Sequence, residues 1–299
     1  MADFVSQYWN WYISIPSVLG ILACAWLVLG NRGSKSSGDS VDTMGHTWDE
    51  DLQEYNNPLP VWWRNMFLIT IVWGLIYLIL YPGLGSFPGV LGWTSQGRYE
   101  AEMARAKETY GPLYARYAAT DLAVLAKDSD AMRTAERLYA SYCSTCHGSD
   151  ARGAIGFPNL RDDSWLWGGE PESVKQTIMN GRVAMMPAWQ VPLGGAEAVA
   201  DVAEYVISLS GREADSARLA SGKQKFGTFC VACHGATGTG NPAMGAPNLI
   251  DTAWLYGGSR GAIRNSIGMG RNGRMPAHGE FLGEDKVHLL AAYVLSLAK

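Results

Sequence analysis

Two Cys-x-x-Cys-His motifs constrain this chain more than any other feature of its sequence. They occupy residues 143–147 and 230–234, and each is typical of the attachment site of a c-type haem. The two thiols form thioethers with the porphyrin vinyl groups, and the adjacent histidine is placed to bind iron. A zinc site would need four clustered ligands, whereas each motif stands alone with one histidine. The sequence therefore predicts two covalently bound haem c groups, attached through Cys143, Cys146, Cys230 and Cys233.

The segment that carries these motifs is duplicated. Pro-Asn-Leu at residues 158–160 returns at residues 247–249, and further Trp-Leu, Gly-Arg, Met-Pro and Tyr-Val pairs return at nearly the same spacing. This pattern indicates a tandem repeat of a domain of roughly 80 residues. The predicted cytochrome c domains are residues 131–211 and 212–299.

Each copy is predicted to be mainly α-helical. A first helix leads into the haem motif, a loop rich in Gly, Pro and Asn follows, and an amphipathic helix closes the copy at residues 196–209 or 284–297. We expect each closing helix to pack its aromatic residue against the first helix of its copy. The pattern resembles the class I cytochrome c fold.

The histidines of the two motifs are the candidate proximal iron ligands. His147 and His234 each follow the second cysteine directly, and a metal-binding imidazole needs a second partner that orients its ring. In class I cytochromes, which each copy resembles, a proline carbonyl in the following loop supplies that partner. Pro158 and Pro247 occupy the matching positions here.

Two methionines are the candidate distal ligands. Met186 and Met275 precede prolines at equivalent positions of the repeat, and a thioether ligand raises the iron potential relative to a second histidine. Each methionine could bind the haem of its own domain or that of the other, because duplicated domains can exchange equivalent loops. Arg182 and Arg271 are candidates for pairing with haem propionates, or they could be solvated.

Two apolar segments precede the repeats. Residues 11–30 carry no charge, and residues 62–82 carry only Arg64, near one end. Both are long enough to cross a bilayer. A signal peptide would begin with a basic region, which residues 1–10 lack. The fold class predicted is thus mainly α, with two N-terminal transmembrane helices followed by two tandem class I cytochrome c domains.

Charge in the loop between the two spans predicts their orientation. The acidic loop 31–61 contains Arg32 and Lys35, while the N-terminal tail contains no Lys or Arg. The positive-inside rule places that loop in the cytoplasm, and haem attachment requires the opposite side. We therefore expect a multi-pass protein of a bacterial inner membrane with periplasmic haem domains, joined to the anchor by a helical linker at residues 83–130.

The segment around the second span resembles a known family. Residues 47–63 include Asn57-Pro58-Leu59-Pro60 and run into a span that ends at Leu80-Tyr81-Pro82-Gly83. This stretch is similar to the N-terminal module of the FixP/CcoP subunit of cbb3-type cytochrome c oxidases, and two haem domains follow in that family's order. The span at residues 11–30 is a departure, because many members have one span.

The resemblance implies a role in respiratory electron transport. Such a subunit accepts electrons from a cytochrome c donor and relays them through two haems toward a monohaem cytochrome c subunit and a catalytic haem–copper subunit. It contacts membrane lipid, binds no nucleic acid and is not itself catalytic. Two alternatives remain, a free-standing membrane-anchored electron carrier and a dihaem peroxidase. A peroxidase, like a gas sensor, would need an open position on one iron.

Overall fold

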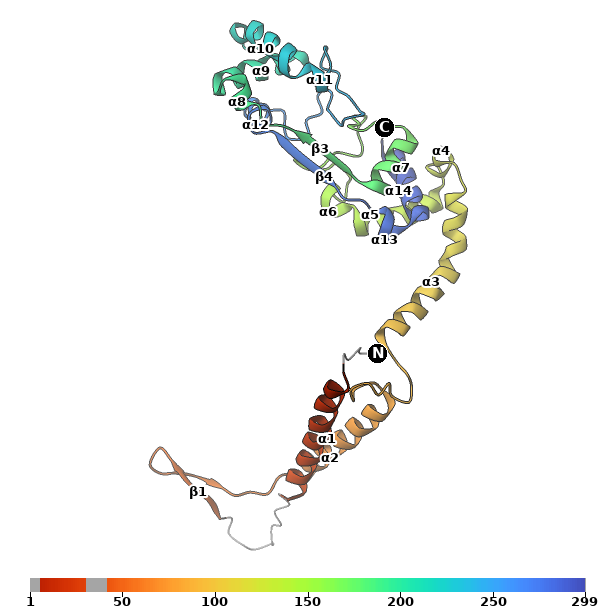
Figure 1. The fold of residues 1–299 in the computed structure, drawn as a ribbon, viewed down its shortest axis with the longest axis vertical. Helices are drawn as coiled ribbons and strands as arrows, with labels where there is room; N and C mark the ends of the chain where they lie inside the picture. The colour runs from red at the N-terminus through yellow and green to blue at the C-terminus, as the bar shows by residue number, and fades with distance from the viewer. Residues whose placement is uncertain (1–5, 31–41, 299) are drawn as a thin grey trace. The chain divides into compact units, whose positions relative to one another are not determined.

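The computed structural model describes residues 6–30 and 42–298, which separate into two compact units, residues 1–108 and 109–299. Figure 1 traces the chain through both units. The first unit contains two long apolar helices and a hairpin of two strands between them, α1 (Gln7–Gly30), β1 (Thr43–Trp48), β2 (Leu52–Tyr55) and α2 (Val61–Leu80). A third helix, α3 (Ser95–Ala118), continues across the boundary into the second unit.

Both apolar helices are long and hydrophobic enough to cross a membrane by length and composition. They agree with the predicted spans to within a few residues, and they contact each other. Asn10 anchors the end of this pair, since its Oδ1 atom accepts a hydrogen bond of 2.9 Å from the Ser86 amide. Arg32 and Lys35, on which the predicted orientation depends, lie outside the described residues.

The strands β1 and β2 were not expected in the loop between the spans. They pair antiparallel, with Trp48 opposite Leu52 and Thr47 opposite Gln53. Every residue of both strands is exposed. The sequence lacks the alternation of apolar and polar residues that a half-buried strand shows, which is why it favoured a loop.

Among the described residues of the second unit, helices joined by loops surround one short antiparallel ladder (Figure 1). Its elements up to that ladder's first strand are α4 (Leu122–Leu125), α5 (Ser129–Tyr142), α6 (Ser144–His147), α7 (Pro171–Asn180) and β3 (Arg182–Met186). The remaining elements are α8 (Gln190–Leu193), α9 (Ala196–Leu209), α10 (Ser216–Phe229), α11 (Val231–His234), α12 (Arg260–Met269), β4 (Arg271–Met275), α13 (Gly279–Leu282) and α14 (Glu284–Leu297).

Side-chain caps define where the helices that lead into the haem motifs begin. The Asp128 carboxylate accepts hydrogen bonds from the amides of Asp130 and Ala131 at the start of α5. Asp215 accepts one from the Ala217 amide at the start of α10. Such caps contribute about 1 kcal/mol each. Both copies of the repeat thus begin this helix with an aspartate cap.

The closing helices do not pack as expected, and this prediction was wrong. Helix α9 packs against α10 and α12 of the following copy, whereas α14 packs against α5 and α7 of the first. The aromatic contacts follow, since Tyr205 lies 5.3 Å from Phe226 and Tyr293 lies 5.4 Å from Tyr139 between ring centroids. The short connection between α9 and α10 explains the difference, because it favours an antiparallel pair of neighbours.

Because α9 and α14 each pack against the other copy, an arrangement called here the exchange of closing helices, two separate hydrophobic clusters form. The first combines α5, α7 and α14, including Tyr139, Leu289 and Leu290. The second combines α9, α10 and α12, including Ile207 and Phe226. Neither cluster is therefore made from one sequence repeat alone.

One buried carboxylate distinguishes the second cluster from the first. Glu204 of α9 is only 1% exposed, and its oxygens lie 3.2 Å from Arg260 Nε and 3.3 Å from Arg264 Nη2. Burial alone would raise the pKa of Glu204, but the Asp215 amide and Arg260 outweigh it and hold the pKa below its ordinary value. The corresponding residue of α14 is Ala292, which is fully buried.

The fold predicts that shortening a buried side chain of α14 destabilises the hydrophobic cluster beside the first haem motif. Leu289→Ala removes a fully buried side chain, and we expect a loss of about 2–5 kcal/mol in the free energy of unfolding. Denaturant unfolding of the purified chain, followed by circular dichroism, measures this loss. Ser296→Ala is the matched control, because Ser296 is exposed on the same helix and should change stability by less than about 0.5 kcal/mol. Equal behaviour of the two variants would contradict the observed packing.

Candidate haem sites

Each Cys-x-x-Cys-His motif forms a tight helical turn at the end of a longer helix. Cys143 caps α5 and the short helix α6 carries Cys146 and His147. The Cys230 amide likewise donates to Phe226 at the end of α10, and α11 carries Cys233 and His234. Both turns thus place two thiols and an imidazole on one short segment, as the sequence predicts.

Both histidine rings are oriented by proline carbonyls. His147 Nδ1 lies 3.0 Å from the Pro158 carbonyl oxygen, and His234 Nδ1 lies 3.1 Å from that of Pro247. Donation of the Nδ1 proton to the carbonyl leaves Nε2 with a free lone pair. Burial lowers the pKa of both histidines, although the hydrogen bonds to proline act in the opposite direction. Burial and the proline carbonyl thus fix the orientation of each ring, with Nε2 as its free nitrogen.

The first cysteine of each motif is partly buried. Burial raises the pKa of the Cys143 thiol to about 11, and the neighbouring Cys146 acts in the same direction. Cys230 behaves alike beside Cys233, with a pKa of about 11. Among the described residues no group of three or more His, Cys, Asp or Glu side chains is placed to hold a metal ion.

A cavity of about 420 Å³ joins the two motifs. Aromatic, aliphatic and glycine residues dominate its lining, which also includes all four motif cysteines and both motif histidines. Met186 and Met275 line the same cavity, and so do the two arginines singled out in the sequence. An apolar hollow beside cysteine pairs and free imidazole nitrogens fits the porphyrin of a c-type haem, so the residues present suit that group.

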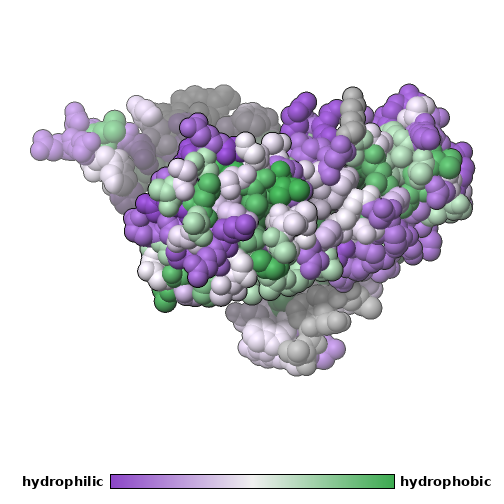
Figure 2. Space-filling view, turned by 90° about the horizontal axis from the view of Figure 1, so that it is seen from above, coloured by the Kyte–Doolittle hydropathy of each residue, from purple (hydrophilic) through white to green (hydrophobic). Residues whose placement is uncertain are grey.

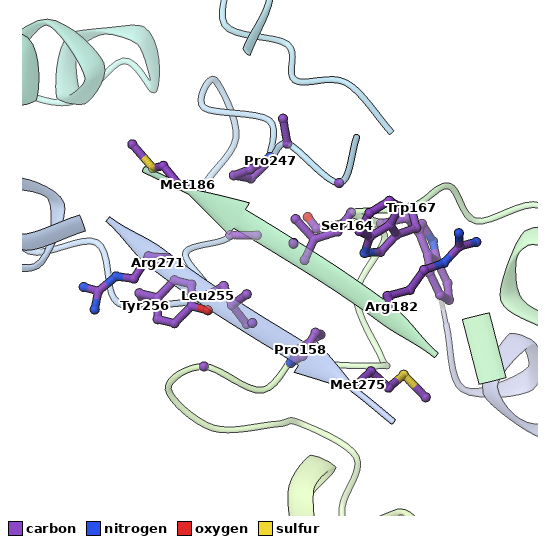
Figure 3. A pocket seen from close by; sticks show the side chains of 18 of the residues that line it. Pro158, Ser164, Trp167, Arg182, Met186, Pro247, Leu255, Tyr256, Arg271 and Met275 are labelled. Atoms are coloured by element: carbon purple, nitrogen blue, oxygen red, sulfur yellow. The ribbon is translucent and has the colours of Figure 1, made fainter. Parts of the chain in front are cut away.

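The strands β3 and β4 pair antiparallel across this cavity and connect the two copies. Arg182 is opposite Met275, Ala184 opposite Gly273, and Met186 opposite Arg271. These six residues form the less exposed face of the ladder. Figure 3 shows the two methionines at opposite ends of it. Because a strand rises about 3.3 Å per residue, the two ends are about 13 Å apart.

The ladder carries each methionine to the motif of the other copy. Met275 packs against the cluster that contains Cys143, whereas Met186 packs against the cluster that contains Cys230. Backbone hydrogen bonds fix both turns, since the His278 amide donates to Ile178 O in the first copy. The equivalent bond joins the Trp189 amide to Ile267 O in the second copy, and both N···O distances are 3.0 Å.

Two glycines permit this crossing. A Cβ atom on Gly181 would lie 2.4 Å from the Met275 carbonyl oxygen, and one on Gly270 would lie 2.4 Å from that of Met186. Both glycines also have φ values near +70°, which favour glycine. The repeated Gly-Arg pair was visible in the sequence, but only the structure gives the contact that requires it.

The arginines of the ladder, unlike the methionines, contact residues of their own copy. Arg182 Nε donates to Thr177 Oγ1 at 2.9 Å, and its guanidinium lies 4.8 Å from the centre of the Trp167 ring. Arg271 makes the corresponding hydrogen bond to Ser266 Oγ and stacks on Tyr256. Sequence reasoning missed Trp167 and Tyr256, although they occupy equivalent repeat positions.

Comparison with protein families covers both parts of the chain. Residues 40–88 match the N-terminal domain of cytochrome oxidase-cbb3, FixP. Residues 130–206 and 217–294 each match the family described as cytochrome c oxidase, cbb3-type, subunit III. The hairpin, the second apolar helix and both haem motifs thus fall within matched regions.

Similar proteins extend over almost the full length. The cbb3-type cytochrome c oxidase subunit CcoP of Rubrivivax gelatinosus is 45% identical over 100% of this chain and 98% of its own length. CcoP of Cereibacter sphaeroides is 36% identical over 89% and 98%, and FixP of Bradyrhizobium sp. (strain ORS 278) is 40% identical over 88% and 97%. The chain therefore belongs to the CcoP/FixP family of cbb3-type cytochrome c oxidase subunits, whose cytochrome c domains serve electron transfer.

Proposed function

We propose that this chain binds two haem c groups and relays single electrons from a cytochrome c donor toward the oxygen-reducing subunit of a cbb3-type oxidase. The observation that carries the proposal is the pair of His–Pro sites in one cavity, with one methionine packed against the hydrophobic cluster beside each. When bound, haem c supplies an iron that alternates between the ferric and ferrous states. The protein holds that iron, sets its reduction potential and keeps the two sites close.

The proposed iron ligands are crossed between the copies. His147 and Met275 bind the first iron, and His234 and Met186 bind the second. This assignment is supported by the packing of each methionine against the cysteine cluster of the other copy. The ladder then fixes the separation of the sites through backbone hydrogen bonds, which favours electron exchange between them.

The partners follow from the family and the chain's composition. We infer that α1 and α2 span a bacterial inner membrane among lipids, with the haem domains on its periplasmic side. In that place the chain contacts a catalytic haem–copper subunit and a monohaem cytochrome c subunit. Hydrophilic and hydrophobic side chains are interspersed on the face that Figure 2 displays, which suits brief docking of a donor better than a permanent hydrophobic interface.

The second candidate function is a free-standing membrane-anchored carrier with the same chemistry. Isolation of the intact membrane complex separates the two functions. We expect the chain to co-purify with haem–copper oxidase activity in a native gel, whereas a free carrier would migrate alone. A dihaem peroxidase is disfavoured, because a methionine packs against the cluster at each motif and would occupy the distal position there.

The first prediction from the proposed function concerns haem stoichiometry. Both motifs are intact, so mass spectrometry of the purified chain should give two haem additions. Peptides with one addition each should contain residues 143–147 and 230–234. Cys143→Ser with Cys146→Ser should remove one addition and leave the other. A wild-type chain with a single addition would contradict the dihaem proposal.

The second prediction tests the crossed ligands. In a chain whose second motif is removed by Cys230→Ser and Cys233→Ser, only the haem on His147 remains. Adding Met275→Ala should abolish the near-infrared band of sulfur-to-iron charge transfer. Met186→Ala in the same background is the matched control and should leave that band. The reverse result would assign each methionine to its own copy.

The third prediction concerns the potential of the haem on His234. Met186→His replaces a thioether by an imidazole, which favours ferric iron and lowers the potential. Each 59 mV of decrease costs about a tenfold change in a one-electron equilibrium. We expect cytochrome c oxidation to slow, while direct reduction of the catalytic subunit by an artificial donor persists. Wild-type rates in both assays would mean either that Met186 is not a ligand or that electrons bypass this chain.

A further inference from the structure

Trp167 contacts the site of His147 through Arg182. The guanidinium of Arg182 lies over its indole ring, and the Nε atom of that guanidinium donates a hydrogen bond to Thr177 Oγ1. Figure 3 shows the indole beside Arg182, near the end of the ladder at which Met275 lies. A ring stacked on a guanidinium fixes the position of its positive charge. Trp167 therefore determines where that charge sits beside the first site.

The six-membered ring of the same indole lies against a loop of the second site. A Cβ atom on Gly245 would lie 2.3 Å from a carbon of the Trp167 ring, so only glycine leaves room for the indole there. Gly245 is buried in the loop that ends in Pro247, and the Pro247 carbonyl orients His234. The ring thus supports the loop that holds the proximal histidine of the other site.

Tyr256 repeats this arrangement in the opposite direction. Its ring lies 4.5 Å from the guanidinium of Arg271, which belongs to the site of His234. A Cβ atom on Gly156 would lie 3.5 Å from the same ring, and the Gly156 amide donates to Leu255 O at 2.8 Å. Gly156 precedes Pro158 in the loop that orients His147. Two reciprocal aromatic contacts therefore join the sites, in addition to the ladder.

We propose that Trp167 and Tyr256 are positioning residues that couple the properties of the two haems, each fixing an arginine beside one iron site and the histidine loop of the other. This inference rests on the proposed dihaem function. A cation beside the iron favours the ferrous state, because reduction adds one negative charge. A firm hydrogen bond from the proximal histidine makes that ligand more basic, which favours the ferric state.

Trp167→Leu should act on the two haems in opposite directions. Without the ring, Arg182 turns toward water and the potential of the first haem falls. The loop around Gly245 loosens, the hydrogen bond between His234 and Pro247 weakens, and the potential of the second haem rises. We expect at least a threefold change in each one-electron equilibrium, which corresponds to about 28 mV.

A potentiometric titration of the purified holoprotein, fitted to two one-electron components, measures both shifts. Thr177→Val is the matched control, because it releases Arg182 without touching Gly245 and should move one component only. Trp167→Phe retains a ring and should give smaller shifts of the same signs. It also keeps the test available if the leucine variant fails to assemble. Tyr256→Leu should give the mirror pattern.

Movement of only one component in both Trp167 variants would overturn the proposal, as would unchanged components. The proposed dihaem function is judged separately on the wild-type chain. If its titration contains a single component with one haem per chain, the dihaem function fails. If wild type has two components and Trp167 moves only one of them, the function stands and the coupling fails.

Discussion

The antiparallel pairing of β3 with β4 is the constraint on which the rest of the second unit depends. It is a ladder of five residue pairs, yet it carries both Met-Pro turns across the molecule and sets where the closing helices can pack. A shift of one strand by one residue would turn the methionine and the arginine of that strand to the exposed face. Gly181 and Gly270 protect the register, because a side chain at either position would collide with the opposite turn.

The two hydrophobic clusters are each incomplete around the cavity that joins the motifs. Their buried residues come from several helices of both copies, and the side that faces the cavity is left apolar. A haem that fills this side adds the contacts that an ordinary core would draw from further side chains. Binding of such a group to the folded state alone also stabilises that state. Cofactor attachment and folding are for this reason linked at both ends of the ladder.

Sequence reasoning reached the parts of the sites that depend on local chemistry. The cysteines, histidines and prolines lie within short segments, and the structure places them together as expected. The helices at 196–209 and 284–297 also begin and end as predicted. The partners of these helices could not be predicted, because duplication gives each helix two nearly equivalent surfaces to pack against. The choice depends on the length of the connections and on the ladder, which has no distinct hydrophobic pattern of its own.

The exchange of α14 has a consequence for how the protein is made. Residues of the first motif emerge from the ribosome long before the turn at Met275 and the helix that covers them, since synthesis proceeds from the N-terminus. The second motif, by contrast, follows shortly after Met186 and α9. A chain that loses its last residues through premature termination would thus keep the elements of its second site and leave its first site open. The site of the first motif can therefore be completed only after Met275 and α14 have been synthesised.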